Sequence, residues 1–417
     1  MKESIKKRIE AVRRGEVPEG YQHTRAGLMP LEWQGDLTAK DIFRNCTNKK
    51  HHGEFEVLSA TQDRGIIPRS DVDIDIKYAG ENIGSYKKVD SGDFVISLRS
   101  FQGGIEYSEY EGLVSPAYTV LKAIKPISDK YYRAYFKTPD FISRLNGAVY
   151  GIRDGKQIGF EDFGDLAIHY PPVAEQQKIA EILTICDRVI ELKQKLLEEK
   201  RRQKRWLMQK LLNPNSGVRL PGFQSSKWSA YRIGELGLVI TGSTPDKSCE
   251  DFWNGDFPWV TSQDFTGKYI YSACARVTEA GKNKCRILPA DAVLVTCIAS
   301  IGLNAISKVE CATNQQINAV ICNDKCCAEM MYYAVEFNRE TFERLAGKTA
   351  VPIISKDQFE KIEIVIPDDP DEQRKITKVL SNADETIRLL GNDLVEWQQK
   401  KKALMQLLLT GLVRVKA

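Results

Sequence analysis

The sequence predicts an α+β protein with two β-rich domains, each followed by a long helix, in a pseudo-two-fold internal repeat. Three observations predict this fold: a helical segment that occurs twice, a heptad pattern in both copies, and a matching order of strands before each copy. The predicted parts are an N-terminal helix over 1–20, β-rich domains over 21–172 and 214–367, and long helices over 173–213 and 368–417.

The repeated helical segment returns at a constant offset of 197 residues. Residues 175–212 and 372–409 align without a gap, and 16 of the 38 paired positions are identical. The run EQQKI at the start of the first copy returns as EQRKI, and both copies close with Leu-Met-Gln and further leucines. A repeat of nearly half the chain predicts two structural units, each ending in a long helix.

Apolar residues recur at alternating steps of four and three in both copies, which is the pattern of a coiled-coil seam. The other faces are polar, so each helix needs a helical partner of its own kind. We expect the two copies to pack on each other within one chain; dimerisation of each helix with another molecule is the alternative. The predicted core of the helix pair is Ile179, Leu183, Ile190, Leu197, Leu207 and Leu211 in the first copy and Ile376, Leu380, Ile387, Leu394, Leu404 and Leu408 in the second.

The segments before the two helices share one order of predicted elements. Each has a β-branched strand, a glycine-bearing turn, a second strand, and then a short helix followed by a strand and a proline. The loop residues differ between the halves, which indicates two related sites with different specificity. The predicted elements lie within 93–98, 115–120 and 163–171 in the first domain and within 291–296, 313–320 and 359–367 in the second.

Residues 2–14 form a predicted basic amphipathic helix that has no counterpart in the repeat, and we expect it beside the end of the C-terminal helix. The chain has no run of 18 apolar residues and no signal-like segment near Met1, which predicts a cytoplasmic protein without a membrane span.

Ten cysteines form no Cys-x-x-Cys pair, and no histidine follows His169, so we expect free buried thiols and no metal site. The net charge of +4 is compatible with nucleic-acid binding through local patches.

With this order of domains and helices, the chain resembles the specificity subunits of type I restriction–modification systems. The resemblance covers nearly the whole chain. It rests on PPVAEQQKI at 171–179, on the Leu-Met-Gln ends of both helices, and on four strings of the second domain. These strings are TGSTP at 241–245, PWVT at 258–261, VTCIASIG at 295–302 and NQQIN at 314–318.

The resemblance implies that each β-rich domain is a target-recognition domain that reads half of a split DNA sequence. It implies that the two helices pair antiparallel and set the length of the unread gap. It also implies two methylation subunits and two restriction–translocation subunits as partners on double-stranded DNA. S-adenosylmethionine, ATP and Mg²⁺ are then expected on those partners, and no cofactor on this chain.

Reading a base sequence needs amide, guanidinium and hydroxyl groups on exposed loops. In the second domain, Asn314, Gln315 and Gln316 are suited to adenine edges, although a turn that satisfies its own backbone is the alternative for 314–318. Solvated surface charge is the alternative for each basic residue. The predicted DNA-binding residues are Lys49, Lys50, Gln62, Arg64, Arg69, Arg99, Ser100 and Gln102 in the first domain and Thr244, Lys247, Thr261, Ser262, Gln263, Ser300, Asn304, Asn314, Gln315 and Gln316 in the second.

The basic run 200–205 on the first long helix faces either DNA phosphates, a partner subunit or solvent. The sequence contains neither an Asn-Pro-Pro-Tyr-like methylation motif nor a Gly-x-Gly-x-x-Gly cradle for a methyl donor. We therefore predict a non-catalytic specificity subunit that works in DNA methylation and host defence. A coiled-coil scaffold, or a decoy specificity protein without an active methyltransferase, is the alternative.

Overall fold

The structure, a computed structural model, describes residues 3–72, 83–98, 100–148, 158–347 and 351–415. The chain divides into two compact units, Met1–Lys193 with Asp393–Ala417, and Gln194–Asn392. Each unit contains one β-rich domain together with the start of one long helix and the end of the other. The two units are described separately below.

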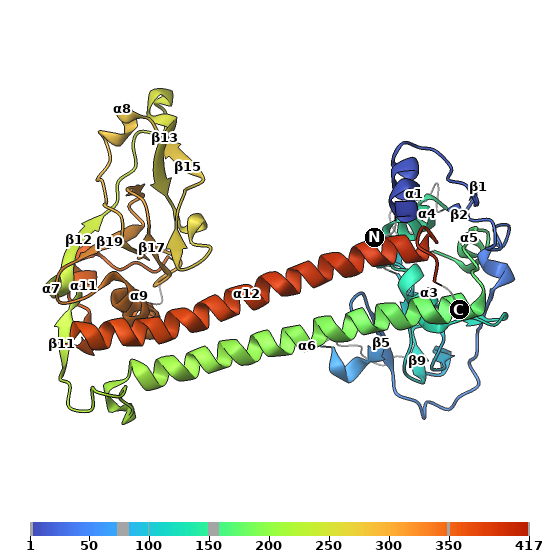
Figure 1. The fold of residues 1–417 in the computed structure, drawn as a ribbon. Coiled ribbons are helices and arrows are strands. Elements are labelled where there is room, and N and C mark those ends of the chain that lie inside the picture. The colour runs from blue at the N-terminus through green and yellow to red at the C-terminus, as the bar shows by residue number, and fades with distance from the viewer. Residues whose placement is uncertain (1–2, 73–82, 99, 149–157, 348–350, 416–417) are drawn as a thin grey trace. The chain divides into compact units, whose positions relative to one another are not determined.

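The long helices are α6 (Val173–Leu211) and α12 (Pro370–Leu409). In the first unit, the start of α6 shares a core with the end of α12, through Ile179 and Leu408 among others. In the second unit, the end of α6 shares a core with the start of α12, through Leu211 and Ile376. The helices therefore run antiparallel within one chain (Figure 1), which confirms the predicted fold class.

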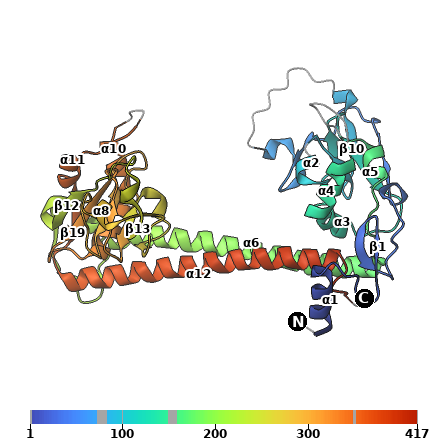
Figure 2. The ribbon, with the colours of Figure 1, turned by 90° about the horizontal axis from the view of Figure 1, so that it is seen from above.

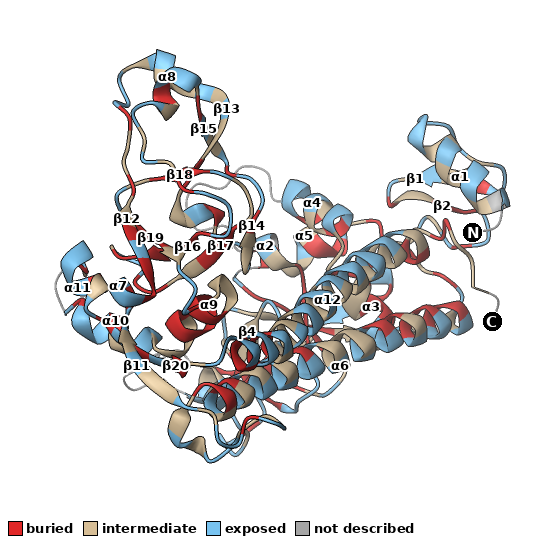
Figure 3. Ribbon diagram, turned by 60° about the vertical axis from the view of Figure 1, so that its left-hand side comes forward, coloured by how far each residue is buried: buried red, intermediate tan, exposed pale blue. Residues whose placement is uncertain are grey.

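The facing sides of the helices are buried toward the helix ends and half-buried between them, while the outer faces are exposed (Figure 3). None of the twelve predicted core residues of the helix pair is exposed. Those that are buried are Ile179, Leu183, Leu197, Leu211, Ile376, Leu380 and Leu408, and those that are half-buried are Ile190, Leu207, Ile387, Leu394 and Leu404.

The β-rich domain of the first unit has a four-stranded sheet in the order β3-β10-β7-β8 and three two-stranded sheets, β1-β2, β4-β5 and β6-β9. Its core is unusually aromatic, with Phe43, Phe94, Tyr132 and Phe136 packed edge to face or tilted around one another. Its elements are α1 (Glu3–Arg13), β1 (Tyr21–Thr24), β2 (Gly27–Pro30), β3 (Phe43–Asn45), β4 (Leu58–Thr61), β5 (Gly65–Pro68), β6 (Lys87–Val89), β7 (Phe94–Ile96), α2 (Ser100–Gly103), β8 (Glu106–Tyr107), β9 (Gly112–Val114), β10 (Thr119–Ala123), α3 (Asp129–Tyr135), α4 (Pro139–Ala148) and α5 (Phe160–Gly164).

The β-rich domain of the second unit has a five-stranded sheet in the order β12-β19-β16-β17-β14, a three-stranded sheet β15-β13-β18, and the pair β11-β20. Aliphatic side chains of the larger sheet pack on α9 and on the helix pair. Its elements are β11 (Trp228–Arg232), α7 (Ile233–Leu236), β12 (Gly237–Thr241), β13 (Trp253–Val260), β14 (Tyr269–Ile270), β15 (Ala275–Val277), α8 (Glu279–Lys282), β16 (Val293–Thr296), β17 (Asn304–Ser307), β18 (Ala312–Thr313), β19 (Ile317–Cys322), α9 (Ala328–Phe337), α10 (Arg339–Leu345), α11 (Lys356–Glu360) and β20 (Glu363–Pro367).

The end of the first domain differs from the sequence prediction. A strand is present at 363–367, where β20 pairs with β11 along five residues. The prediction of a corresponding strand within 163–171 is wrong. In this segment Ala167 makes an isolated bridge to Thr38, and Tyr170 makes one to Gln34. The same apolar pattern thus gives a strand only where a partner strand runs alongside it.

The N-terminal helix lies beside the end of α12, as expected (Figure 2). The Arg8 guanidinium donates a hydrogen bond to the Leu412 carbonyl oxygen at 2.6 Å, and the Tyr21 hydroxyl donates one to the Gly411 carbonyl oxygen at 2.7 Å. These contacts tie the first thirty residues of the chain to its last ten.

All ten cysteines are free. Four of them are buried, namely Cys186, Cys297, Cys311 and Cys326, whereas Cys274 is exposed. The prediction of buried thiols is therefore confirmed for part of the cysteines. No helix in the described part of the chain is both long enough and apolar enough to cross a membrane.

Candidate nucleic-acid interface

A buried glutamine near the start of each long helix attaches the helix to its domain. The Gln176 Oε1 accepts a hydrogen bond from the Ser128 backbone N–H at 2.9 Å. The Gln373 Oε1, 197 positions later, accepts one from the Cys327 N–H at 3.2 Å, and its Nε2 donates to the Lys325 carbonyl oxygen at 2.8 Å. Ser128 and Cys327 are the N-cap residues of α3 and α9. Each glutamine therefore satisfies a helix N-terminus of the domain that it carries.

The glutamate before each glutamine holds a tryptophan from the start of the same domain. The Trp33 Nε1 donates a hydrogen bond to Glu175 at 2.9 Å, and the Trp228 Nε1 donates one to Glu372 at 3.3 Å. Both carboxylates are almost fully buried. Glu175 also binds an arginine, Arg414, through two hydrogen bonds of 2.8 and 2.9 Å, and no such contact is made by Glu372 in the part of the chain that the structure describes. The repeated Glu-Gln pair thus fixes each domain on its helix from two sides.

Lysine–aspartate ion pairs cross the helix pair in both units. Lys204 of α6 binds Asp384 of α12 at 2.7 Å, and Lys401 of α12 binds Asp187 of α6. The two pairs are equivalent at the offset of 197. Lys204 also binds Glu336 of α9 at 2.9 Å. Burial lowers the pKa of Lys204, but the carboxylates of Glu336 and Asp384 together raise the pKa above its ordinary value. These polar contacts favour a single register of the seam.

The basic run 200–205 on α6 is therefore divided between two roles. Lys204 is directed inward, as described, and Lys200 donates a hydrogen bond to Gln203 at 3.0 Å. The remaining guanidinium groups, of Arg201, Arg202 and Arg205, are exposed. Only this exposed part of the run is available to phosphates or to a partner subunit.

In the second unit, three of the loops predicted to bind DNA converge on a fourth, the turn between β18 and β19. The loop after β13 lies beside this turn because β13 pairs in parallel with β18. The Thr244 hydroxyl of the loop after β12 donates a hydrogen bond to the Gln315 side chain. The Cys297 N–H, at the start of the loop after β16, donates one to the Gln316 carbonyl oxygen at 2.8 Å. Residues separated by more than seventy positions thus form one surface.

The loop after β12 is held rigidly in this cluster. A side chain at Gly242 would overlap the Asn314 carbonyl oxygen, so glycine is required by the close approach of the two loops. The Trp259 Nε1 donates a hydrogen bond to the Ser243 carbonyl oxygen at 3.0 Å, and Arg286 Nη1 donates one to the carbonyl oxygen of the last residue of β12 at 2.8 Å. The TGSTP string is therefore a fixed platform.

The predicted residues of this domain differ in their exposure and in their hydrogen bonds, and Gln315 and Gln316 are exposed although each accepts an internal hydrogen bond. The Thr261 hydroxyl donates a hydrogen bond to Asp264 at 3.1 Å, and the Asn304 side chain donates one to the Tyr332 carbonyl oxygen at 2.6 Å. The Asn314 side chain accepts one from the Gln316 N–H at 3.1 Å. Asn314 therefore shapes its own turn, which was the alternative for this residue. Thr244 and Ser262 are half-buried, whereas the exposed residues are Lys247, Gln263, Ser300, Gln315 and Gln316.

Asp264 fixes the loop after β13. Its carboxylate accepts hydrogen bonds from the Thr261 N–H and the Cys274 N–H, both at 2.8 Å. Burial raises the pKa of Asp264, but these hydrogen bonds outweigh burial and leave it below its ordinary value. The carboxylate is therefore charged at neutral pH and holds the exposed Gln263 in place.

In the first unit, two of the predicted loops meet at Lys137. Its ammonium donates hydrogen bonds to the carbonyl oxygens of Gln62 at 3.3 Å and Gly103 at 2.8 Å, and to Glu106 at 2.6 Å. A Cβ at Gly103 would lie 2.9 Å from the Gln62 side chain, so these loops are in contact. Lys137 was not predicted, because its position depends on contacts between distant segments.

The remaining predictions for the first domain are spread over more surface. Ser100 is buried, and its hydroxyl accepts a hydrogen bond from the Ser97 N–H at 2.9 Å, so its side chain supports α2. Arg64 donates to the Asp71 carbonyl oxygen at 3.0 Å, and Arg69 is half-buried. Arg99 lies outside the described residues. The exposed residues are Lys49, Lys50, Gln62, Arg64 and Gln102.

Arg286 is an exposed basic residue of the second domain that sequence reasoning missed. Its backbone N–H donates a hydrogen bond to the Ser243 hydroxyl at 2.9 Å, so it belongs to the same loop cluster. It lies in no recognisable motif, and only the folded chain brings it beside TGSTP. Together with Lys247 it adds positive charge to a cluster of amide side chains.

The loop cluster of the second domain has the chemistry needed for base readout. Gln263, Gln315 and Gln316 offer amide donors and acceptors, which suit the adenine edge in the major groove. Lys247 and Arg286 offer charge for neighbouring phosphates. The rigid loop platform keeps these groups in one place.

A family model described as the type I restriction modification DNA specificity domain matches residues 34–200 and 225–396. The specificity subunit of the type I restriction enzyme MjaIX from Methanocaldococcus jannaschii is 32% identical over 186 residues, which are 43% of this chain and 41% of that subunit. The HindI specificity subunit from Haemophilus influenzae is 30% identical over 34% of this chain and 32% of its own length. This chain thus aligns with less than half the length of either relative.

Other comparisons span almost the whole chain. The putative MjaX specificity subunit of M. jannaschii is 24% identical over 95% of this chain and 97% of its own. A chain from a structure on assembly and conformational transition of a type I restriction–modification system has a TM-score of 0.60 at 16% identity, with coverage of 92% and 99%. The S subunit from M. genitalium has a TM-score of 0.55 at 15% identity, with coverage of 92% and 97%. These structures support the fold, and the family model, which matches both halves, shows that the chain belongs to the type I restriction–modification DNA specificity family.

Proposed function

We propose that this chain is the DNA-recognition subunit of a type I restriction–modification complex and reads a bipartite, asymmetric target. The observation that carries the proposal is one scaffold built twice with unlike loops. The same Glu-Gln pair anchors both domains, whereas among the described residues an amide-rich loop cluster is formed in the second domain and not in the first. Two equal scaffolds with different loops are suited to reading two different half-sites.

The chain itself has no catalytic role in this proposal. It positions two adenine-N6 methylation subunits and two restriction–translocation subunits on double-stranded DNA. S-adenosylmethionine, ATP and Mg²⁺ bind to those partners, and the complex works in the cytoplasm. The exposed arginines of α6 contact either the DNA phosphates between the half-sites or a partner subunit.

The test is long-read detection of N6-methyladenine in DNA from cells that co-express this chain with its cognate methylation subunit. We expect a gapped, asymmetric methylated motif that disappears when this chain is omitted. The control is the same methylation subunit with another specificity subunit, which shows that it is active. With that control positive, absence of any new motif would favour a scaffold or decoy protein and contradict the proposal.

A second prediction concerns the length of the helix pair. Seven residues inserted into each helix, after Lys193 and after Asn392, keep the heptad register and add about 10 Å to the pair. The gap in the methylated motif is expected to grow by about three base pairs, at 3.4 Å for each. The same insertion between Leu211 and Trp228, outside the helix pair, is expected to leave the gap unchanged. An unchanged gap after the helical insertion would show that the helices do not set the spacing.

A further inference from the structure

The first unit contains a polar cavity of about 540 Å³ between α3, α6 and the end of α12. Its volume lies within the range of small-molecule sites in proteins. The wall includes Ala134 of α3, Thr184 and Asp187 of α6, and Lys401 of α12. The internal repeat supplies a second copy of these positions, so the two units can be compared side chain by side chain.

Equivalent positions in the two units follow from the long helices and from the N-caps of α3 and α9. The constant offset of 197 pairs Thr184 with Ser381, Asp187 with Asp384, and Lys401 with Lys204. The N-cap residues Ser128 and Cys327 are equivalent because the two anchoring glutamines bind them. The sixth residue after each N-cap is Ala134 in the first unit and Tyr333 in the second.

In the second unit the space at these positions is filled by the protein's own side chains. The Lys268 ammonium donates hydrogen bonds to the Ser381 hydroxyl at 2.7 Å and to the Tyr333 hydroxyl at 3.3 Å. The Tyr333 hydroxyl donates one to Asp384 at 2.6 Å, and the ammonium lies 4.5 Å from the centroid of the tyrosine ring. An ammonium group and a phenol thus join α9 to α12.

In the first unit both of these groups are missing, since Ala134 has no ring and no second lysine reaches the acceptors of α6 in the described part of the chain. The Thr184 hydroxyl donates a hydrogen bond within α6, and its oxygen accepts none from the described residues. Among the same residues, Asp187 accepts a hydrogen bond from Lys401 alone. The Asp187 side chain is 58% exposed, whereas that of Asp384 is 25% exposed. The two acceptors are therefore open to a ligand in the cavity.

The other charged side chains of the wall leave no excess charge of either sign. Two oppositely charged pairs bind each other, Lys137 with Glu106 at 2.6 Å and Arg133 with Glu109 at 2.5 Å. Asp63 and Lys130 are exposed, so solvent screens both charges. The open acceptors of α6 therefore decide what binds, and they favour a cation that carries a second hydrogen-bond donor.

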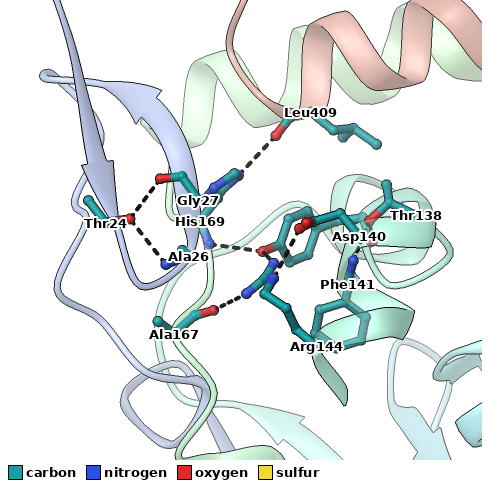
Figure 4. A network of polar contacts seen from close by, with 11 residues as sticks. Thr24, Ala26, Gly27, Thr138, Asp140, Phe141, Arg144, Ala167, His169 and Leu409 are labelled. Atoms are coloured by element: carbon teal, nitrogen blue, oxygen red, sulfur yellow. Dashed lines mark hydrogen bonds and ion pairs between the residues drawn. The ribbon is translucent and has the colours of Figure 1, made fainter. Parts of the chain in front are cut away.

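The α3 side of the cavity is held in place by the residue that follows Ala134. The Tyr135 hydroxyl accepts hydrogen bonds from Arg144 at 2.9 Å and from the His169 backbone N–H at 3.3 Å. Arg144 also donates one to the Ala167 carbonyl oxygen at 2.6 Å (Figure 4). These contacts fix α3 from its other face, so the cavity is preformed.

We propose that this cavity binds a small aromatic amine, which supplies the ammonium group and the ring that the first unit lacks. The ammonium group donates to the Thr184 hydroxyl oxygen, and a second donor on the ring binds the Asp187 carboxylate. Apolar residues of the wall, Leu183 and Met405 among them, pack on the ring. The bound molecule joins α3 to α6 as the chain's own side chains join α9 to α12. It therefore stabilises the attachment of the first domain to the helix pair.

The test compares 2-hydroxybenzylamine with 2-hydroxybenzyl alcohol by isothermal titration calorimetry on the full chain. The amine carries its ammonium group beside a phenol hydroxyl, as Lys268 lies beside Tyr333, whereas the alcohol has the same shape without the charge. The amine is expected to bind at least tenfold more tightly, which corresponds to about 1.4 kcal/mol. Asp187→Asn is expected to abolish this preference, because it removes the carboxylate charge. Asp165→Asn, the matched control at an exposed aspartate that also binds a lysine, is expected to keep it.

Ala134→Tyr places the side chain of the second unit in the cavity and is expected to abolish binding of the amine. Methyl resonances of ¹³C-labelled alanine in the unsubstituted chain give a readout that does not depend on any variant folding. Those of Ala134 and Ala180, which line the cavity, are expected to move when the amine is added, and that of Ala334 in α9 to stay in place. Equal binding of the two probes, binding of neither, unchanged binding by a folded Ala134→Tyr variant, or unmoved Ala134 and Ala180 resonances with bound amine would each overturn the proposal.

Discussion

Replacing Glu175 by alanine is expected to destabilise the first unit by about 3 kcal/mol, since a buried carboxylate that binds a cation is lost. Glu175 is 3% exposed and accepts hydrogen bonds from Trp33 and from two nitrogens of Arg414. Without it, the ion pair left to Arg414 among the described residues is the one with Glu32, whose side chain is 75% exposed. The Trp33 Nε1 also loses its acceptor within the core.

The internal repeat supplies the matched control for this substitution. Glu372 accepts hydrogen bonds from Trp228 and from the Ser226 hydroxyl, and it forms no ion pair with an arginine in the described part of the chain. Glu372→Ala is therefore expected to cost less, about 1–2 kcal/mol, because only neutral donors are left unsatisfied. Free energies of local opening from hydrogen exchange, measured on amides of 21–34 and of 226–232, separate the two effects.

A double-mutant cycle gives the sharper test of the ion pair. Glu175→Ala and Arg414→Ala are expected to be strongly non-additive, because the second substitution removes the charge that the first leaves unpaired. Glu175→Gln is expected to lie between the native chain and the alanine variant. Equal losses at positions 175 and 372, or additive losses in the cycle, would show that Arg414 contributes little.

The sequence was sufficient to predict the helix pair because its signal is local and repeated. The heptad seam identified twelve residues, none of which is exposed, and the exact offset identified Glu175 and Gln176 as equivalents of Glu372 and Gln373. The pattern did not reveal what these anchors bind. The partners of Gln176 and Gln373 are backbone groups on α3 and α9, which no pattern of side chains displays.

The loop residues were predicted less well, and the reasons are physical. Ser100 and Asn304 have side chains suited to base edges, but internal hydrogen bonds use them to support α2 and α9. Arg286 and Lys137 reach the loop clusters only through contacts between distant segments. A polar residue in a loop satisfies the backbone as readily as it meets DNA, and the sequence does not distinguish the two uses.

The contacts that attach the second domain to the helix pair explain why this domain is expected to be exchangeable for that of another family member. Gln373 binds the N–H of Cys327 and the carbonyl oxygen of Lys325, so it requires a helix N-terminus rather than particular side chains. The side chains that the domain itself must supply to the helix pair include Trp228 for Glu372 and Glu336 for Lys204. Its recognition loops take no part in these contacts and are free to differ.

Replacement of 214–367 by the corresponding domain of another family member that keeps equivalents of Trp228 and Glu336 is therefore expected to change one half of the methylated motif. The other half and the gap should stay the same, because the first domain and both long helices are untouched. Long-read detection of N6-methyladenine measures all three at once, and replacement of 21–172 is the reciprocal control, expected to change only the opposite half. A change in both halves after a single exchange would mean that the two domains do not read DNA independently, and that the duplicated anchor does not make the domain a separate recognition module.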